Sequence, residues 1–223
     1  MNRLEYLYSL KSPLPGTDLR KWPKGALRQW WGENPLLYSA SKTDDLHRFL
    51  GGHTGIDIAP PFRTPVYAAH GGDVPFNMVF DNPARAGGRE VWVYSDPIDG
   101  ETPGNSRVCT VYCHLDEIAA KPGQRVNQGD LLGYVGNTGF VVSGGTEFWG
   151  NAPANVGVHL HFGLYELILD KQGNWVRRTV NVLNGSSDPL PYITETPDRP
   201  AGDLSGLTVV INNMLRYLKR RGN

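Results

Sequence analysis

The stretch GVHLHFGLYELIL, residues 157–169, alternates between polar or small and apolar side chains as a β-strand does. On an extended chain His159 and His161 point to one side, and the opposite side receives Leu160, Phe162 and Leu164. Two imidazoles side by side on one face can both meet a small cation or the water bound to it. The stretch therefore predicts a core strand with one polar face, on which the candidate functional residues His159 and His161 lie.

Further short apolar runs fill the middle of the chain, separated by Gly, Pro, Asn and Asp. The composition, with 27 Gly and 17 Pro, favours many short strands over long helices. The strands that we expect cover residues 66–70, 90–95, 107–115, 130–136, 157–169 and 175–180. The predicted fold class is mainly β with a few short helices.

The chain divides into three parts by composition. Residues 1–45 form a Trp- and Pro-rich N-terminal segment, which we expect to be largely irregular and to pack on the domain that follows. Residues 46–192 hold the strands and form the main domain. Residues 193–223 form a tail whose apolar residues recur at helical spacing from Leu204, which predicts an amphipathic C-terminal helix.

Charge and hydropathy exclude several classes of partner. Lys plus Arg and Asp plus Glu both total 22, so no net field attracts nucleic acid. No run approaches the roughly 18 apolar residues of a membrane span. The N-terminus has charges and prolines where a secretory signal has its apolar core. We expect another route out of the cell, or a signal outside this sequence.

The motif HTGID carries a second pair of candidate ligands, His53 and Asp57. The surrounding glycines, β-branched residues and prolines oppose a helix. In an extended segment His53, Gly55 and Asp57 share one face, while Ile56 and Ile58 enter the core. Gly55 then leaves space between imidazole and carboxylate, where an ion can sit.

The run RVCTVYCHL, residues 107–115, adds another histidine. Alternation groups His114 with Val108, Thr110 and Tyr112. The opposite side, which we expect to be the core face, holds Cys109, Val111, Cys113 and Leu115. His114 is thus predicted to share the working surface with the other candidate ligands. His47 and His70 lack such support and are not expected at a metal.

The two cysteines are expected to be core filler. Four residues of extended chain separate Cys109 from Cys113 by about 13 Å, which is twice the reach of a disulfide. If the strand alternates, Cys113 points away from His114, which argues against a Cys–His nucleophile pair.

Five motifs, in the order HTGID, VYAA, YCHL, PGQRVNQGDLLGYVGNTG and HLHF, resemble the lysostaphin-type (LytM-like) zinc metallopeptidases. The resemblance covers roughly residues 46–192. It implies one zinc ion held by His53, Asp57 and His161, with His114 and His159 contacting the catalytic water and the reacting carbonyl. Alternation alone leaves open which of His159 and His161 is the ligand. The implied fold is an antiparallel β-sheet of the duplicated hybrid motif type, which floors a groove framed by loops.

The resemblance implies a zinc metalloendopeptidase that hydrolyses peptide bonds in peptidoglycan stem peptides or cross-bridges, taken here as a monomer acting at the cell wall. The loops at residues 81–90 and 141–157 differ from those of familiar family members, so the resemblance does not specify which peptide bond is cut. A phage-associated lysin fits the missing signal. The alternatives are a non-catalytic zinc-binding cell-wall module that regulates another hydrolase, and a structural component of a phage.

Overall fold

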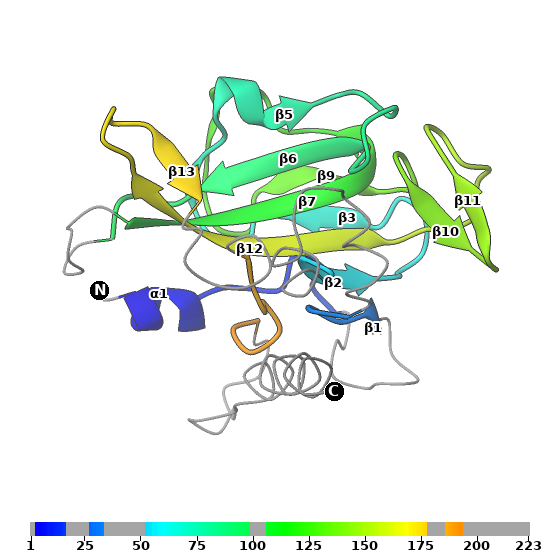
Figure 1. Cartoon of the computed structure of the whole chain (residues 1–223), viewed down its shortest axis with the longest axis horizontal. Helices are drawn as coiled ribbons and strands as arrows, with labels where there is room; N and C mark the ends of the chain where they lie inside the picture. Colours follow the sequence, from blue (N-terminus) through cyan, green and yellow to red (C-terminus); the bar gives the residue numbers. More distant parts are fainter. Residues whose placement is uncertain (1–2, 17–26, 34–51, 99–105, 178–185, 194–223) are drawn as a thin grey trace, which may run out of the picture.

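The structure is a computed structural model that describes residues 3–16, 27–33, 52–98, 106–177 and 186–193. Within these ranges the chain forms one short α-helix, one 3-10 helix and many short strands (Figure 1). In chain order the elements are α1 (Arg3–Tyr8), β1 (Leu27–Gln29), β2 (Gly55–Ile58), β3 (Pro65–Tyr67), β4 (Gly72–Asp73), η1 (Phe76–Met78), β5 (Val79–Phe80), β6 (Arg89–Tyr94), β7 (Ser106–Ile118), β8 (Arg125–Val126), β9 (Leu131–Val135), β10 (Val141–Ser143), β11 (Thr146–Phe148), β12 (Leu160–Leu169), β13 (Trp175–Arg177) and β14 (Ser186–Ser187).

The long strands β7 and β12 form the centre of one antiparallel sheet, whose main path runs β1-β2-β12-β7-β6-β4-β8. The pairing of β12 with β7 runs from His161 opposite Cys113 to Ile168 opposite Ser106. On its other edge β12 pairs with β2, where His161 lies opposite Asp57. The mainly antiparallel β fold predicted from the sequence is thus confirmed. The predicted C-terminal helix lies outside the described residues, and the three-part division of the chain stays a prediction.

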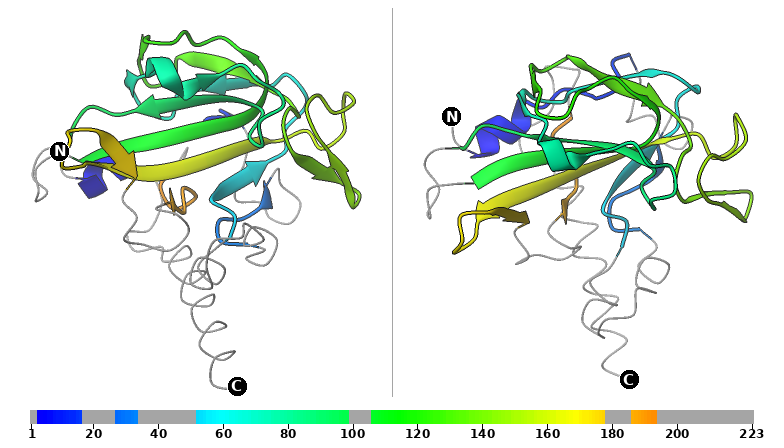
Figure 2. Two further views of the ribbon diagram at one scale, coloured as in Figure 1. Left: turned by 45° about the horizontal axis from the view of Figure 1, so that its top comes forward. Right: turned by 90° about the horizontal axis from the view of Figure 1, so that it is seen from above.

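The main core lies on one side of this sheet. Tyr112 and Phe162 are fully buried there, with ring centroids 5.3 Å apart. Strands β3 and β9 lie behind the β7–β12 pair and close this side of the core (Figures 1 and 2). The N-terminal segment contributes Leu14 and Trp31 to the same cluster. Burial of these large apolar groups is the main stabilising term for such a sheet.

The opposite side of β7 is also buried, which corrects the predicted assignment of its faces. Tyr112, expected on the polar face, lies in the main core. The expected core residues Cys109, Val111 and Cys113 lie on the other side, where they pack with Tyr165 and Leu167. Because both faces of β7 are covered, alternation of polarity could not separate them. Both cysteines are free, and burial raises the pKa of each thiol, which disfavours the nucleophilic thiolate.

A β-bulge interrupts β7 between Tyr112 and Leu115. Val91 of β6 pairs with Tyr112, whereas Arg89 pairs with Leu115, so β7 has one more residue between these pairs than β6. His114 sits in this bulge with a positive φ of 62°. The extra residue lets Tyr112 and Leu115 both enter the main core and turns His114 to the other side. His114 thus reaches the predicted surface through a bulge and not through alternation.

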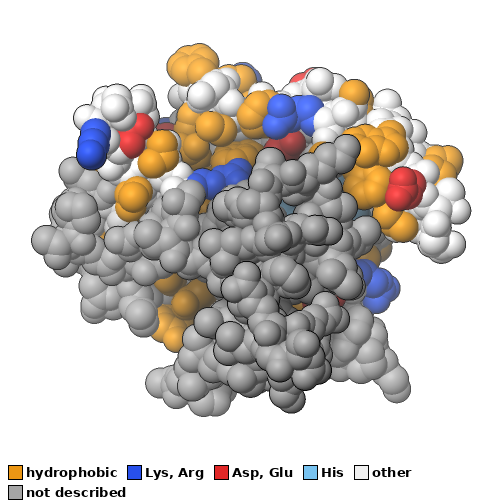
Figure 3. All heavy atoms as spheres, in the orientation of Figure 1, with side chains coloured by type: hydrophobic (Ala, Val, Ile, Leu, Met, Phe, Trp, Pro, Cys, Tyr) orange, Lys and Arg blue, Asp and Glu red, His pale blue; other side chains and the backbone are white. Residues whose placement is uncertain are grey.

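Two peripheral features frame the sheet. The N-terminal helix α1 packs through its buried residue Leu7. The hairpin β10–β11 projects from the end of the molecule (Figure 2), and Figure 3 shows hydrophobic side chains exposed there. Trp149, which directly follows β11, is 61% exposed. Neither of the two helices within the described ranges is long and apolar enough to cross a membrane.

Candidate metal centre

Three ligand-type side chains converge at one point: His53 just before β2, Asp57 in β2 and His161 in the neighbouring strand β12. His53 Nε2 lies 2.8 Å from His161 Nδ1 and 3.0 Å from Asp57 Oδ1, and His161 Nδ1 lies 3.1 Å from Asp57 Oδ1. Metal–ligand bonds of about 2.0 Å at tetrahedral angles place donor atoms about 3.3 Å apart. The three atoms therefore fit one small cation after a slight expansion. Imidazole nitrogen and carboxylate oxygen are the donors that zinc prefers in catalytic sites.

The tautomer of His53 determines which of its ring nitrogens has a lone pair directed at the other two residues. Its Nδ1 lies 3.2 Å from the carbonyl oxygen of Trp30, which only accepts hydrogen bonds, so Nδ1 carries the proton. In the neutral ring Nε2 then points a lone pair at a carboxylate oxygen and at a second imidazole nitrogen. Electron pairs that face one another at these distances repel, so either a cation or the ring proton of His161 lies between them.

The electrostatics of Asp57 favour its ionised form. Burial opposes ionisation, but the neighbouring imidazoles of His159, His53 and His161 hold the pKa of this carboxyl well below its usual range. The side chains of Asp57 and His161 are each 14% exposed. The centre is therefore anionic and partly open to solvent, as a site for a cation and a water molecule must be.

Gly55 is required between the two ligands of HTGID. A Cβ atom at this position would lie 2.9 Å from Nε2 of His161 and 2.4 Å from the carbonyl oxygen of Phe162. The sequence predicted space for an ion beside Gly55, and the structure fills that space with the ring of His161. The absence of a side chain is what lets His161 approach His53 and Asp57.

His114 lies beside this cluster. Its backbone N–H donates to the carbonyl of Gly87, and its Nδ1–H donates to the carbonyl of Thr138 at 2.7 Å. Burial, reinforced by the neighbouring His159 and His161, lowers the pKa of His114 to about 3. The ring is therefore neutral at pH 7, with a lone pair on Nε2.

His159 has the same construction. Its Nδ1 donates to the carbonyl of Gly157 at 2.7 Å, which leaves the lone pair on Nε2. The ring centroid lies 4.5 Å from that of His114, and Nε2 lies 3.8 Å from Asp57 Oδ1. Within the described part of the chain, Nε2 of neither His114 nor His159 makes a hydrogen bond. Two basic nitrogens thus stand next to the three converging donors.

The structure brings together all five residues that the sequence predicted for the site. His70 lies apart in a separate buried network, as expected, and His47 is outside the described residues. Sequence reasoning missed the backbone acceptors that orient the rings, which belong to Trp30, Thr138 and Gly157. The pattern of side chains in a sequence does not predict which backbone carbonyl will accept a hydrogen bond. Thr138 nevertheless belongs to the GNTG motif, which contributed to the resemblance.

The two unusual loops both border the site. Residues 81–90 supply the Gly87 carbonyl that holds the backbone of His114. Residues 141–157 form the β10–β11 hairpin and a return segment that ends at the Gly157 acceptor of His159. The side-chain amide of Asn137 donates to the carbonyls of Pro153 and Val156, both at 2.8 Å, and fixes this return segment. The loops therefore position both histidines of the pair.

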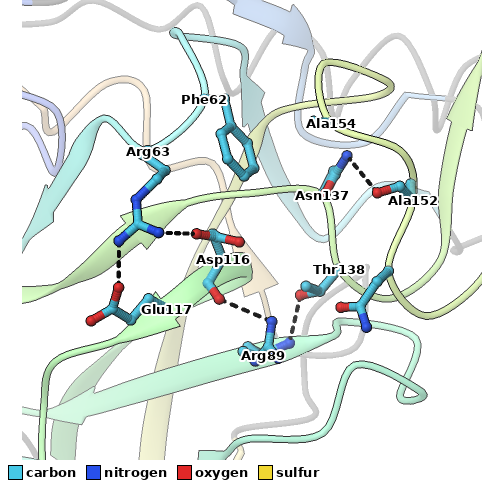
Figure 4. Close-up of a pocket in the computed structure, with 10 residues that line it drawn as sticks. Phe62, Arg63, Arg89, Asp116, Glu117, Asn137, Thr138, Ala152 and Ala154 are labelled. Atoms are coloured by element: carbon cyan, nitrogen blue, oxygen red, sulfur yellow. Dashed lines mark hydrogen bonds and ion pairs between the residues drawn. The ribbon is translucent and has the colours of Figure 1, made fainter.

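A pocket of about 440 Å³ adjoins the site beyond Thr138 (Figure 4). Arg63 pairs there with Asp116 and Glu117 across the pocket wall. Arg89 donates to the backbone carbonyl of Asp116, and its own N–H donates to Oγ1 of Thr138. These lining charges are thus engaged with protein partners, and the ligand-type cluster lies outside the pocket.

The sequence of this chain matches that of known peptidases. A family model for Peptidase family M23 matches residues 51–177, which is more than half of the chain. This chain belongs to Peptidase family M23. The peptidoglycan DD-endopeptidase ShyA of Vibrio cholerae is 35% identical over 163 residues, which cover 73% of this chain and 29% of ShyA. The uncharacterized lipoprotein YgeR of Escherichia coli is 27% identical over 128 residues, covering 57% of this chain and 44% of YgeR.

Among solved structures, LytU aligns over 82% of this chain and 94% of its own, with 29% identity and a TM-score of 0.48. The curated relatives are longer than the region they share with this chain, which spans less than a third of ShyA and less than half of YgeR. What those whole proteins do therefore extends to this chain only as a proposal.

Proposed function

We propose that this protein is a zinc-dependent endopeptidase that hydrolyses peptide bonds in peptidoglycan stem peptides or cross-bridges. The observation that carries the proposal is the convergence of His53, Asp57 and His161, whose ligand atoms all lie within 4.8 Å of one another. Membership of a peptidase family and the similarity to ShyA support the reaction class and the substrate class.

In this proposal one zinc ion is held by His53, Asp57 and His161. Bound zinc would lower the pKa of a coordinated water towards about 7 and polarise the scissile carbonyl. An aspartate ligand leaves the site less positive than three histidines would.

The proton transfers belong to His114 and His159. Each is oriented by an Nδ1–H bond to a backbone carbonyl, so each offers Nε2 to the reaction. One of the two accepts a proton from the attacking water, and the pair stabilises the developing oxyanion and protonates the leaving amine. The partial exposure of His159, at 16%, admits water and substrate to this end of the pair.

The test is mass spectrometry of fragments released from a panel of purified sacculi by the wild type, by His161→Ala and by Asp57→Asn. We expect release by the wild type alone, with new termini that identify the bond. A chelator should stop release, and added zinc should restore it. Asp57→Asn preserves the shape of the side chain and removes its charge, so it separates loss of the ligand from loss of packing.

A zinc-loaded wild type that releases nothing from any wall type would overturn the proposal. That result would favour a non-catalytic cell-wall module, or a substrate outside peptidoglycan.

A further inference from the structure

The N-terminal segment encloses the first candidate ligand through its backbone. His53 donates its N–H to the carbonyl of Glu33 at 2.9 Å, and its own carbonyl accepts from the N–H of Gly32 at 2.8 Å. The Nδ1 of His53 donates to the carbonyl of Trp30 at 3.2 Å. Both backbone groups of His53 and one ring nitrogen are therefore bonded to residues 30–33.

The same segment extends to the second candidate ligand. Strand β1 pairs with β2 along the edge of the sheet, and Gln29 lies opposite Asp57. Residues 27–33 thus run beside both ligands of the HTGID motif. This stretch lies before residues 51–177, which are the part of the chain that matches the family.

The turn formed by residues 30–33 is itself built to hold its shape. The N–H of Glu33 donates to the Trp30 carbonyl at 3.3 Å, and the Glu33 carboxylate accepts from the N–H of Trp30 at 3.1 Å. Gly32 has a φ of 79°, which an L side chain rarely adopts. Trp31 anchors the turn, since its ring is buried and its Nε1–H donates to Ser186 Oγ at 2.8 Å.

This arrangement decides which nitrogen of His53 can bind a metal. The Trp30 carbonyl accepts a hydrogen bond and cannot donate one, so it selects the tautomer with the proton on Nδ1. That tautomer presents the Nε2 lone pair to His161 and Asp57. Without the carbonyl, the two neutral tautomers would compete, and only one of them presents the lone pair at Nε2 to the metal.

We propose that the turn at residues 30–33 is a positioning element of the metal centre, which fixes the tautomer and the backbone of His53 and thereby raises the affinity for zinc. This inference rests on the proposed zinc function. It gives residues outside the family match a role in retaining the metal. Hydrogen-bond partners of metal-bound histidines typically contribute about 10- to 100-fold to metal affinity.

The test measures the zinc dissociation constant of the full-length chain by competition with a chromogenic chelator. Gly32→Ala introduces a side chain at the positive φ, and Glu33→Ala removes the acceptor that closes the turn. Each should weaken zinc binding by about 10- to 100-fold. The matched control is Leu7→Ala, which disturbs another buried contact of the N-terminal segment away from His53. It should lower the melting temperature and leave the zinc affinity unchanged.

A second readout follows the tautomer directly in the metal-free protein. The ¹⁵N shifts of the His53 ring should report an Nδ1–H imidazole in the wild type and a mixture of tautomers in Gly32→Ala. Zinc affinities of Gly32→Ala and Glu33→Ala within twofold of the wild type would overturn the inference. An equal loss of affinity in Leu7→Ala would do the same, because it would indicate general destabilisation. A wild type that binds no zinc would instead overturn the proposed function.

Discussion

Strand β7 separates two buried histidines, His70 and His114, whose rings are oriented in the same way but face different surroundings. His70 lies on the side of Tyr112, and His114 lies on the side of the candidate metal centre. In both rings Nδ1 donates to a backbone carbonyl, of Gly71 and of Thr138 respectively. The two rings therefore present the same atom, Nε2 with its lone pair, to different surroundings.

The Nε2 of His70 has a partner within the protein. A chain of hydrogen bonds runs from the N–H of Ala69 to the Tyr112 hydroxyl, on to Thr110 Oγ1, and from there to His70 Nε2. Each proton of this chain has an acceptor only while the His70 ring is neutral. The edge of the Tyr6 ring closes the remaining side, with centroids 5.7 Å apart.

In the candidate metal centre His53, Asp57 and His161 converge, and Nε2 of His114 and of His159 makes no hydrogen bond to the described residues. His53 Nε2 faces a carboxylate, and the Nε2 atoms of His114 and His159 stand beside it. A buried polar group without a partner is costly, so proteins keep such groups chiefly where a ligand or a reaction uses them. The surroundings of the second ring nitrogen, more than burial, therefore distinguish the histidines of the candidate metal centre from His70.

The largest effect that tests this comparison concerns His114. We expect His114→Ala to lower kcat by about 10²- to 10⁴-fold, the usual contribution of a general acid or base. The zinc content should stay unchanged, because the three proposed ligands remain. His70→Gln, which alters the closed network, is the control and should keep the kcat of the wild type. Activity of His114→Ala within tenfold of the wild type would refute the role assigned to this residue.

Much of this division could be read from the sequence. The alternation of residues 157–169 placed His159 and His161 on one face, and the glycines of HTGID excluded a helix. The choice of His161 over His159 came from the resemblance to a family, because parity treats the two alike. The geometry is consistent with that choice, since His161 Nδ1 joins the close triangle of donor atoms and His159 Nε2 stands 3.8 Å from Asp57.

The position of His114 could not be derived from its strand. Alternation fails in β7 for two physical reasons: both of its faces are buried, and a bulge shifts the parity at His114. In a sequence, Gly or Asn usually indicates a residue with positive φ, whereas here a histidine adopts this conformation. The contact of Trp30 with His53 was equally hidden, because a carbonyl acceptor depends on where the chain passes and not on side-chain chemistry.

A smaller effect concerns the pH dependence of stability. Burial lowers the pKa of His70 from 6.5 to about 4, so the unfolded chain binds a proton there before the folded protein does. The stabilisation that depends on neutral His70 is complete above pH 6.5, and it is lost as the pH falls towards 4. The shift corresponds to about 3 kcal/mol of the free energy of unfolding, at 1.36 kcal/mol per pKa unit.

Urea denaturation of the wild type and of His70→Gln between pH 7 and pH 4 checks this expectation. Because all other titrating groups are common to the two proteins, the difference between their stability curves isolates His70. The wild type should lose up to about 3 kcal/mol more than the variant over this range. Parallel curves would mean that His70 becomes protonated in the folded protein over this pH range. The hydrogen-bond chain from Tyr112 through Thr110 to His70 would then be wrongly assigned.

The smallest effect tests the bulge that brings His114 to the site. Its φ of 62° disfavours any residue with a Cβ, and a glycine adopts it without that strain. His114→Gly and His114→Ala both lack the imidazole, so both should lose kcat by the same factor of about 10² to 10⁴. Thermal denaturation should nevertheless find the glycine variant more stable by roughly 1 kcal/mol, since alanine retains the strained Cβ. An alanine variant as stable as the glycine variant would indicate that β7 relaxes once the ring is gone, and that the ring itself holds the bulge open through its bond to Thr138.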